Sequence, residues 1–333
     1  MKESIVNSYL HLQYNSILGA VAQRIFDQEI STRKVSRLQQ KIHNCIKSTL
    51  IRWKDPLISY GIHNYEIKLP LSHLLPTILK NYPYYSSNLA RLASYANNKY
   101  DDFRLIDIGA NVGDSVALLR AQAYFPILCI EGEDYFLKVL QENIAQFSEV
   151  SIAPTFVGDA NAIVMGEVIG YGGTAHLENI EASTGTSKFQ LRRLGQVLEE
   201  HPDFLNAKMV KIDTDGFDGK IIRGAVDILE RSKPILFFEY DPFFLEQQGD
   251  NGLNIFTLLI KCGYSGLIIY DNYGDLLICL PEIDLDRIEE IDLHFSGRKN
   301  NQYCDICAFH SEDKDLFMRA RASELQFFHN LKK

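Results

Sequence analysis

The sequence predicts an α/β protein with a mostly parallel sheet that is covered by helices on both faces. Short apolar runs typical of fully buried strands recur between residues 105 and 238. Stretches with helical spacing of apolar residues separate most of these runs. A glycine-rich turn directly follows the first run, at the kind of sheet edge where open α/β proteins bind ligands.

The predicted strands of the parallel part are continuous apolar runs rather than alternating ones, as expected for strands with no solvent-facing side. They are Leu105–Ile108, Ile127–Ile130, Ile152–Val157, Met209–Ile212 and Ile235–Phe238. Helical patterns lie near residues 113–123, 135–147, 189–200 and 219–231. This alternation of strand and helix is typical of parallel sheets.

The last third of the chain predicts antiparallel strands near the C-terminus. Residues 266–270 and 276–280 flank a turn that contains Asn272, Gly274 and Asp275, and they read as a hairpin. Residues 302–309 predict a later strand. The segment 158–187 is too long for a routine connection, so we expect either a lid or a small hairpin excursion there.

The first hundred residues predict a separate N-terminal helical extension. Residues 1–55 read as helices, residues 65–69 as a strand, and residues 86–97 as a further helix. We therefore place an N-terminal helical and mixed region at 1–100 and the main domain at 101–333. The N-terminal helices also offer a surface through which two copies could pair as a homo-oligomer.

Composition excludes several classes of protein. Apolar residues make up 46% of the 333 residues and the net charge is −9, so we expect a globular chain that does not bind nucleic acid or an anionic membrane. No apolar stretch approaches the length of a membrane span, and residues 1–20 lack the pattern of a secretory signal. Six cysteines are too few for a disulfide scaffold, which indicates a reduced, cytoplasmic protein.

One cysteine pair raises the question of a metal site. Cys304 and Cys307 form a CxxC pair, but a structural zinc site normally needs a second pair, and the sequence has none. Residues three apart on a strand point to opposite faces of the sheet. We therefore interpret these cysteines as core residues of a strand.

The glycine-rich turn carries the strongest functional signal. Gly109, Asn111 and Gly113 give the pattern G-x-N-x-G, which differs from the G-x-G-x-x-G of dinucleotide sites. Asp107, at the end of the preceding strand, would repel a pyrophosphate and would suit a cationic ligand. Glu131 ends the next strand, where a carboxylate can accept hydrogen bonds from both ribose hydroxyls. An adenosine with a positive centre and no phosphate describes S-adenosylmethionine (SAM).

A second cluster of acids follows the strand that ends at Ile212. Asp213 is a candidate base for a substrate hydroxyl, Asp213 and Asp215 are candidate ligands of a divalent cation, and Asp215 or Asp218 is a candidate helix cap. The positions after Asp215 do not fit a calcium loop, and no His or Asn completes a ligand set, so we expect no metal. We favour a functional role for Asp213 and a capping role for Asp218.

Two further residues are candidates for the reaction. Glu239 ends the next strand on the same sheet edge and is a candidate for substrate binding. His176 follows the pair Gly172 and Gly173, whose flexibility suits a closing loop, and it is a second candidate base.

Together these segments resemble the FkbM family of SAM-dependent methyltransferases. The resemblance covers roughly residues 65–310 and rests on the segments Leu105–Asp114, Cys129–Asn143, Lys211–Ala225 and Lys233–Glu239. It implies a Rossmann-like class I methyltransferase fold and O-methylation of a sugar, polysaccharide or natural-product hydroxyl. It also implies that Asp107, Gly109, Asn111 and Gly113 line the methionine part of SAM, that Glu131 holds the ribose, and that Asp159 or Ala160 lies near the adenine.

Methyl transfer is the first of three functional hypotheses. In it, Asp213 takes the proton of the acceptor hydroxyl, with His176 as the second choice of base. A metal-dependent nucleotide-sugar glycosyltransferase would use Asp213 and Asp215, but it leaves Asp107 and Glu131 unexplained. A non-catalytic SAM-binding interaction protein would bind the cofactor without turnover and would dock through residues 1–100.

Overall fold

The structure is a computed structural model, and it describes residues 17–31, 36–171, 174–179, 187–296 and 302–332, with only the backbone of residues 167–171 and 174–179. The chain divides into two units. One consists of Met1–Pro83 and Tyr171–Thr174, and the other of Tyr84–Gly170 and Ala175–Lys333. This division begins the second unit before the boundary that we predict after residue 100.

The first unit contains helices and a β-hairpin. Residues 17–30 are helical, and the helices α2 (Arg37–Trp53) and α3 (Leu75–Asn81) flank the antiparallel strands β1 (Leu57–Ile62) and β2 (Tyr65–Pro70) in the chain. Helix α2 begins with a capping box, because Ser36 Oγ accepts from the Gln39 N–H and Gln39 Oε1 accepts from the Ser36 N–H. The sequence predicts β2 but not β1.

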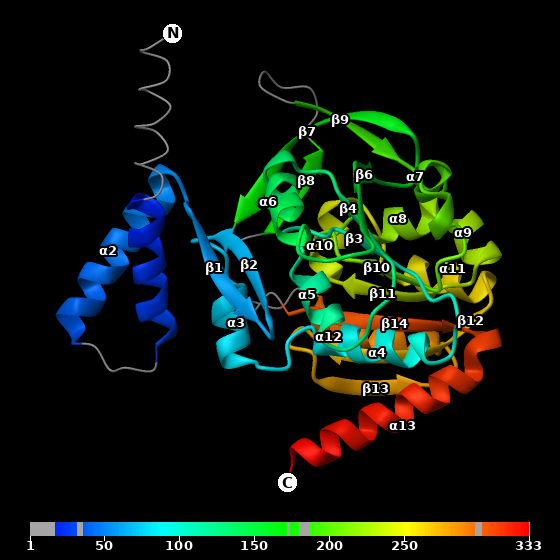
Figure 1. The fold of residues 1–333 in the computed structure, drawn as a ribbon. Coiled ribbons are helices and arrows are strands. Elements are labelled where there is room, and N and C mark those ends of the chain that lie inside the picture. Colours follow the sequence, from blue (N-terminus) through cyan, green and yellow to red (C-terminus); the bar gives the residue numbers. More distant parts are fainter. Residues whose placement is uncertain (1–16, 32–35, 172–173, 180–186, 297–301, 333) are drawn as a thin grey trace. The chain divides into compact units, whose positions relative to one another are not determined.

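The second unit is built on an eight-stranded sheet (Figure 1). The strand order is β13-β12-β14-β11-β10-β3-β4-β5. Strands β11, β10, β3, β4 and β5 are parallel, whereas β14, β12 and β13 pair antiparallel. The bounds are β3 Leu105–Ile108, β4 Ile127–Glu131, β5 Val150–Pro154, β10 Met209–Ile212, β11 Ile235–Tyr240, β12 Tyr264–Asp271, β13 Leu276–Leu280 and β14 Cys304–His310. The predicted fold class is confirmed, including its antiparallel strands near the C-terminus.

Helices cover both faces of this sheet. One face packs against α4 (Ser87–Asn97), α5 (Asp114–Arg120), α6 (Asp134–Ile144) and α13 (Lys314–Leu331). The other packs against α7 (Leu194–Glu200), α8 (Asp218–Gly224), α9 (Val226–Arg231), α10 (Pro242–Gln247), α11 (Leu253–Lys261) and α12 (Leu285–Phe295). Cys304 lies in the core on the second face and Cys307 in the core on the first, as strand geometry predicts.

The chain also contains a four-stranded sheet of order β6-β9-β7-β8. Of the two structures expected for segment 158–187, a lid or a hairpin excursion, the chain therefore has the hairpin excursion. The strands of this sheet are β6 (Phe156–Val157), β7 (Ala162–Tyr171), β8 (Thr174–Asn179) and β9 (Ser187–Arg192). Two predictions are wrong here. The predicted strand 152–157 breaks after Pro154, and the predicted helix 189–200 begins only at Leu194, because residues 187–192 pair with β7 instead.

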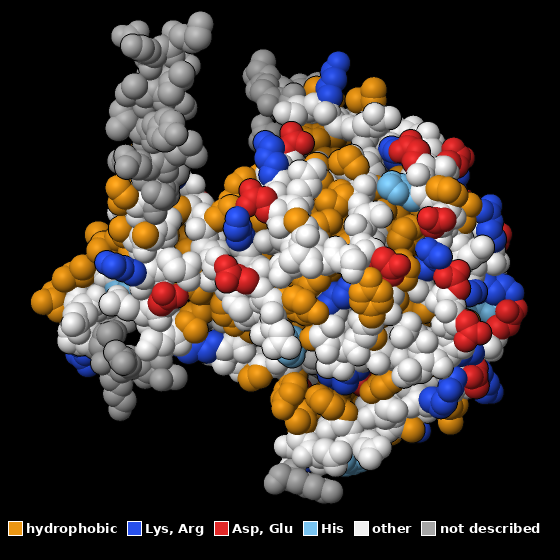
Figure 2. All heavy atoms as spheres, in the orientation of Figure 1, with side chains coloured by type: hydrophobic (Ala, Val, Ile, Leu, Met, Phe, Trp, Pro, Cys, Tyr) orange, Lys and Arg blue, Asp and Glu red, His pale blue; other side chains and the backbone are white. Residues whose placement is uncertain are grey.

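The surface of the second unit carries mixed charge. Figure 2 shows acidic and basic side chains interspersed over its visible face, with no continuous basic patch among the described residues there. Among the helices that the structure describes, none is long and apolar enough to cross a bilayer.

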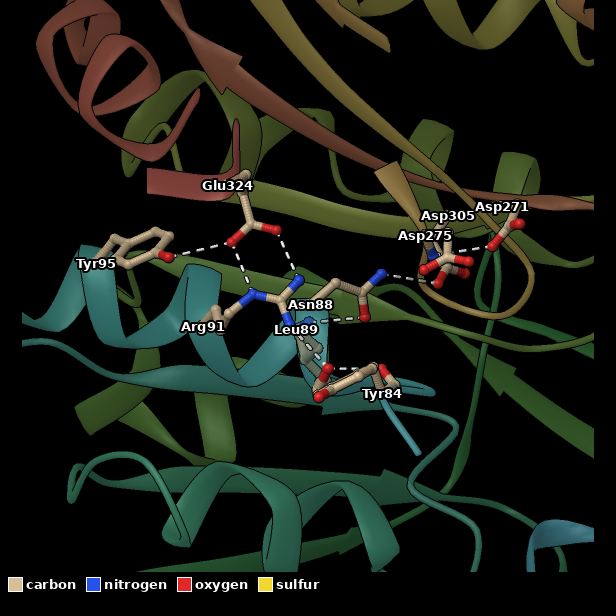
Figure 3. A network of polar contacts seen from close by, with 10 residues as sticks. Tyr84, Asn88, Leu89, Arg91, Tyr95, Asp271, Asp275, Asp305 and Glu324 are labelled. Carbon is tan, nitrogen blue, oxygen red and sulfur yellow. Dashed lines mark hydrogen bonds and ion pairs between the residues drawn. The ribbon is translucent and has the colours of Figure 1, made fainter. Parts of the chain in front are cut away.

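A buried ion pair joins α4 to the C-terminal helix α13 (Figure 3). Arg91 Nε and Nη2 donate to the two carboxylate oxygens of Glu324 at 2.8 and 2.6 Å, and Tyr95 Oη donates to Glu324 Oε1 at 3.1 Å. The Arg91 guanidinium also lies 3.9 Å from the ring centre of Phe327. Glu324 is fully buried, so its charge depends on these partners.

We expect Glu324→Gln to lower the free energy of unfolding by about 3 kcal/mol, because it leaves the buried Arg91 charge without its counter-ion. Urea unfolding measures the change. Arg319→Gln is the control: its ion pair with Asp315 is exposed, and its loss should cost less than about 1 kcal/mol. Equal effects of the two substitutions would contradict this account of α13.

Candidate active site

The candidate site lies where the strand order of the large sheet reverses. Strand β3 pairs with β4 on one side and with β10 on the other, so the crevice above its carboxyl end is the topological switch point. The residues at this edge follow the order of the strands. Across the sheet they are Asp271, Asp305, Glu239, Asp213, Gly109 and Glu131.

The turn after β3 is shaped by positive φ angles. Gly109, Asn111 and Gly113 have φ values of +77°, +48° and +83°. A Cβ on Gly109 would lie 1.9 Å from the Asp213 carbonyl oxygen, and one on Gly113 would lie 2.8 Å from Leu140 Cδ1. The glycines are therefore required first by the packing of the turn against the chain itself.

A buried ion pair between Lys211 and Asp107 stabilises this turn. Lys211 Nζ lies 2.9 Å from Asp107 Oδ1 and donates to the Gly109 carbonyl oxygen at 3.0 Å. Ser115 Oγ donates to the other oxygen of Asp107. Asp107 is completely buried, so its carboxylate serves the turn rather than an open pocket. Lys211 was not among the predicted site residues. Its position as a lysine inside an otherwise apolar strand could have indicated it.

Glu131 lies at the tip of β4 and is largely buried. Its Oε2 accepts from the Asn111 N–H and its Oε1 from the Glu133 N–H, both at 2.8 Å. Burial raises the pKa of Glu131, while the backbone donors oppose that shift. A carboxylate oxygen has two lone pairs, so each oxygen retains capacity for a further donor.

Asp213 follows β10 directly, and its side chain is about half exposed, at 51%. Its Oδ2 lies 3.4 Å from Lys211 Nζ, and its backbone N–H donates to the Ile108 carbonyl oxygen. Of Asp107, Glu131, Asp213 and Glu239, Asp213 is thus the least buried. Its neighbour Asp215 has φ +48°, and burial, with the charges of Asp213 and Asp241, raises the pKa of Asp215 to about 7.

Glu239 extends the acidic edge onto β11. It is only 8% exposed, and burial together with the negative charges of Asp213 and Asp215 raises the pKa of its carboxyl well above the ordinary value. Across the antiparallel ladder it faces Asp305 of β14. Burial raises the pKa of Asp305 to about 7, and Asn88 Nδ2 donates to Asp305 Oδ2 at 3.2 Å.

The capping role predicted for Asp218 is wrong. Helix α8 begins at Asp218, and the cap residue is Phe217, whose side chain makes no capping bond. Thr214 Oγ1 donates to Asp218 Oδ2 at 2.9 Å instead. Asp241, by contrast, does cap a helix, because it accepts from the Phe243 and Phe244 N–H groups at the start of α10.

The remaining predicted residues lie toward the smaller sheet. Asp159 is exposed and follows β6, and its Cα would lie 2.8 Å from a Cβ on Gly224. His176 is a backbone position in β8, and its side chain lies outside the described part of the chain. The structure thus brings Asp107, Gly109, Asn111, Gly113, Glu131, Asp213 and Glu239 to one sheet edge.

Some residues at this edge, among them Asp305, Tyr85 and Tyr303, were not among the predicted site residues. Asp305 reaches it only because β14 inserts between β11 and β12. Tyr303 lies close to Tyr85, and the negative charges of Asp213 and Asp305 add to burial in raising the pKa of Tyr85. No local motif marks these positions in the sequence.

The raised carboxyl pKa values predict a pH-dependent stability. Burial raises the pKa of Asp218 to about 7, so between its ordinary value and pH 7 the folded state holds a proton that the unfolded state has lost. Stability therefore falls as pH rises through this range. We expect Asp218→Asn to make that fall shallower by up to about 1.4 kcal/mol per pH unit.

Urea unfolding at several values between about pH 5 and pH 6.5 measures this slope. The exposed substitution Asp203→Asn is the control and should leave the slope unchanged. Identical slopes for Asp218→Asn and the unsubstituted protein would show that Asp218 is ionised in the folded state.

Comparison with known proteins agrees with this geometry. Residues 107–265, just under half of the chain, match the family model described as the methyltransferase FkbM domain. The match begins at the buried Asp107 and includes Glu131, Asp213 and Glu239. No curated protein matches the chain.

Solved methyltransferase structures show distant similarity. Methyltransferase FkbM from Methylobacillus flagellatus KT is 16% identical with a TM-score of 0.37, over 54% of this chain and 43% of its own length. Precorrin-6y C5,15-methyltransferase from Geobacter metallireducens GS-15 is 14% identical with a TM-score of 0.35, over 66% of this chain and 87% of its own length. The Pyrococcus abyssi tRNA (uracil-54, C5)-methyltransferase, in complex with S-adenosyl-L-homocysteine, is 9% identical with a TM-score of 0.36, over 77% of this chain and 45% of its own length. This chain thus spans less than half the length of the first of these proteins.

The resemblance seen in the sequence is therefore confirmed by the family match, and the topology around it is that of a Rossmann-like fold. Residues 107–265 are thus similar in sequence to the methyltransferase FkbM domain.

Proposed function

We propose that this protein transfers a methyl group from SAM to a hydroxyl of a sugar, polysaccharide or natural-product acceptor. The observation that carries the proposal is the placement of Glu131 and Asp213 at strand tips on either side of the β3 turn. One carboxylate is buried and preorganised by backbone donors, whereas the other is open to a ligand. These are the properties that a nucleoside holder and a proton acceptor require.

The residues of the turn fit SAM as a cofactor. Glu131 would accept hydrogen bonds from the two ribose hydroxyls with the lone pairs that Asn111 and Glu133 leave available. Gly109, Asn111 and Gly113 would line the methionine part, and Asp107 would act through Lys211 by holding that turn in place. Asp159 would lie near the adenine.

Methyl transfer to a hydroxyl needs alignment and removal of one proton. When bound, SAM supplies a methyl group on a sulfonium, which is a good leaving group. Asp213 would hold the acceptor hydroxyl in line and take its proton, and His176 is the second candidate for this step. Glu239, one strand further along the edge, would bind the acceptor.

The family match favours methyl transfer over the two alternatives. Nucleotide-sugar transfer would require Asp213 and Asp215 to hold a metal and a diphosphate, and it would leave Asp107 and Glu131 without a role. A non-catalytic SAM-binding protein would bind the cofactor but show no turnover, which the second experiment below tests. Three expectations stay predictions: two copies pair through the N-terminal helices, the protein does not bind nucleic acid, and it is located in the cytoplasm.

We expect Glu131→Gln to weaken binding of S-adenosylhomocysteine about tenfold, because the amide replaces a charged acceptor of two ribose hydroxyls. Calorimetry with the demethylated cofactor measures this without any acceptor. Glu282→Gln, an exposed change of the same chemistry, is the control and should bind as the unsubstituted protein does. Unaltered affinity of Glu131→Gln would remove Glu131 from the cofactor site.

We expect Asp213→Asn to lower the rate of methyl transfer by on the order of 10²–10⁴-fold, because the amide cannot take the proton. The measurement is transfer of label from methyl-labelled SAM to a panel of sugar acceptors. Cofactor affinity, measured separately, should remain within about twofold. Full turnover of Asp213→Asn would assign proton removal to another group.

A further inference from the structure

We propose that the acceptor carries a protonated amine as well as the hydroxyl that is methylated, and that Glu239 and Asp305 bind this ammonium group. The proposal rests on the function proposed above and adds the chemical class of the acceptor. It concerns the part of the sheet edge that lies beyond Asp213, away from Glu131.

The two acids are cross-strand neighbours, and they lie apart from the proposed cofactor half of the edge. Glu239 of β11 and Asp305 of β14 are directly paired in the antiparallel ladder. Strands β10 and β3 separate β11 from β4, which carries Glu131. With neighbouring strands about 4.8 Å apart, Glu239 is about 14 Å across the sheet from Glu131. The pair is therefore placed to meet the acceptor rather than the ribose.

Glu239 is a buried acid without a partner. It is 92% buried, since 8% of its surface is exposed, and no hydrogen bond or ion pair joins its carboxylate to another described residue. Its neighbours Asp213, Asp215, Asp218 and Asp241 are all acids. A buried carboxylate in this setting is costly unless a positive group approaches it, so the arrangement favours a cationic ligand.

The cations of the protein near this edge are bonded elsewhere. Lys211 binds Asp107 and the Gly109 carbonyl oxygen, and Arg91 binds Glu324. Asp305 receives a bond from the neutral amide of Asn88, and the charge of Asp271 lies close to it (Figure 3). The Glu239–Asp305 pair thus lacks a counter-ion of its own among the described residues.

The ligand that fits is an organic cation rather than a metal ion or a phosphate. No group of three or more possible metal ligands is found among the described residues. An anionic acceptor would be repelled by the same charges. Tyr85 and Tyr303, which lie within the field of Asp213 and Asp305, add aromatic rings of the kind that attract ammonium groups.

A matched pair of probes tests the proposal. D-Glucosamine differs from D-glucose by one ammonium group in place of a hydroxyl, and both can be titrated into protein saturated with S-adenosylhomocysteine. We expect glucosamine to bind at least tenfold more tightly than glucose. Glu239→Gln and Asp305→Asn should each reduce that preference at least fivefold, and the affinity for S-adenosylhomocysteine should not change.

Glu289→Gln is the matched control, because Glu289 is an exposed acid on α12, and it should keep the full preference. Glucosamine binding no more tightly than glucose, or a preference that survives both substitutions, would overturn the proposal. Failure of S-adenosylhomocysteine to bind the unsubstituted protein would instead overturn the proposed function itself.

Discussion

The ion pair between Asp107 and Lys211 is the interaction on which the site depends. It joins the adjacent strands β3 and β10 under the switch point, and Lys211 also holds the carbonyl of Gly109. With the turn held there, the chain after β10 approaches so closely that only glycine fits at position 109. The same contact places Asp213 beside the cofactor turn, so the geometry of both loops follows from one buried pair.

Lys211 pairs with Asp107 and lies 3.4 Å from Asp213, whereas no ion pair joins Asp215, Asp218 or Asp305 to another described residue. Burial then raises the pKa of Asp215, Asp218 and Asp305 to about 7. Such an edge favours positive ligands and disfavours phosphate esters. The field therefore suits SAM, and it separates this site from the diphosphate sites that share the strand–turn–helix plan.

The sequence predicts the central strands well because their signals are local. β3 and β10 agree in both bounds with the predicted runs 105–108 and 209–212, since each is a continuous apolar stretch that ends at turn residues. The helix predicted for residues 189–192 is wrong. Four residues are too few to distinguish the strand period of 2 from the helix period of 3.6, and the pairing with β7, which is distant in the chain, makes them a strand. The predicted helix 219–231 breaks at Ala225 into α8 and α9.

The candidate site likewise has one part with local sequence signals and one part that depends on the pairing of strands distant in the chain. The proposed cofactor half comes from two consecutive strand–turn units, so Gly109, Glu131 and their spacing are visible in the sequence. The proposed acceptor half requires β14 to return between β11 and β12, which pairs Asp305 with Glu239 although they are 66 positions apart in the chain. A family pattern built from local motifs therefore identifies the donor of the methyl group more readily than its acceptor. The chemistry of the acceptor must be derived from the charges that the sheet order brings together.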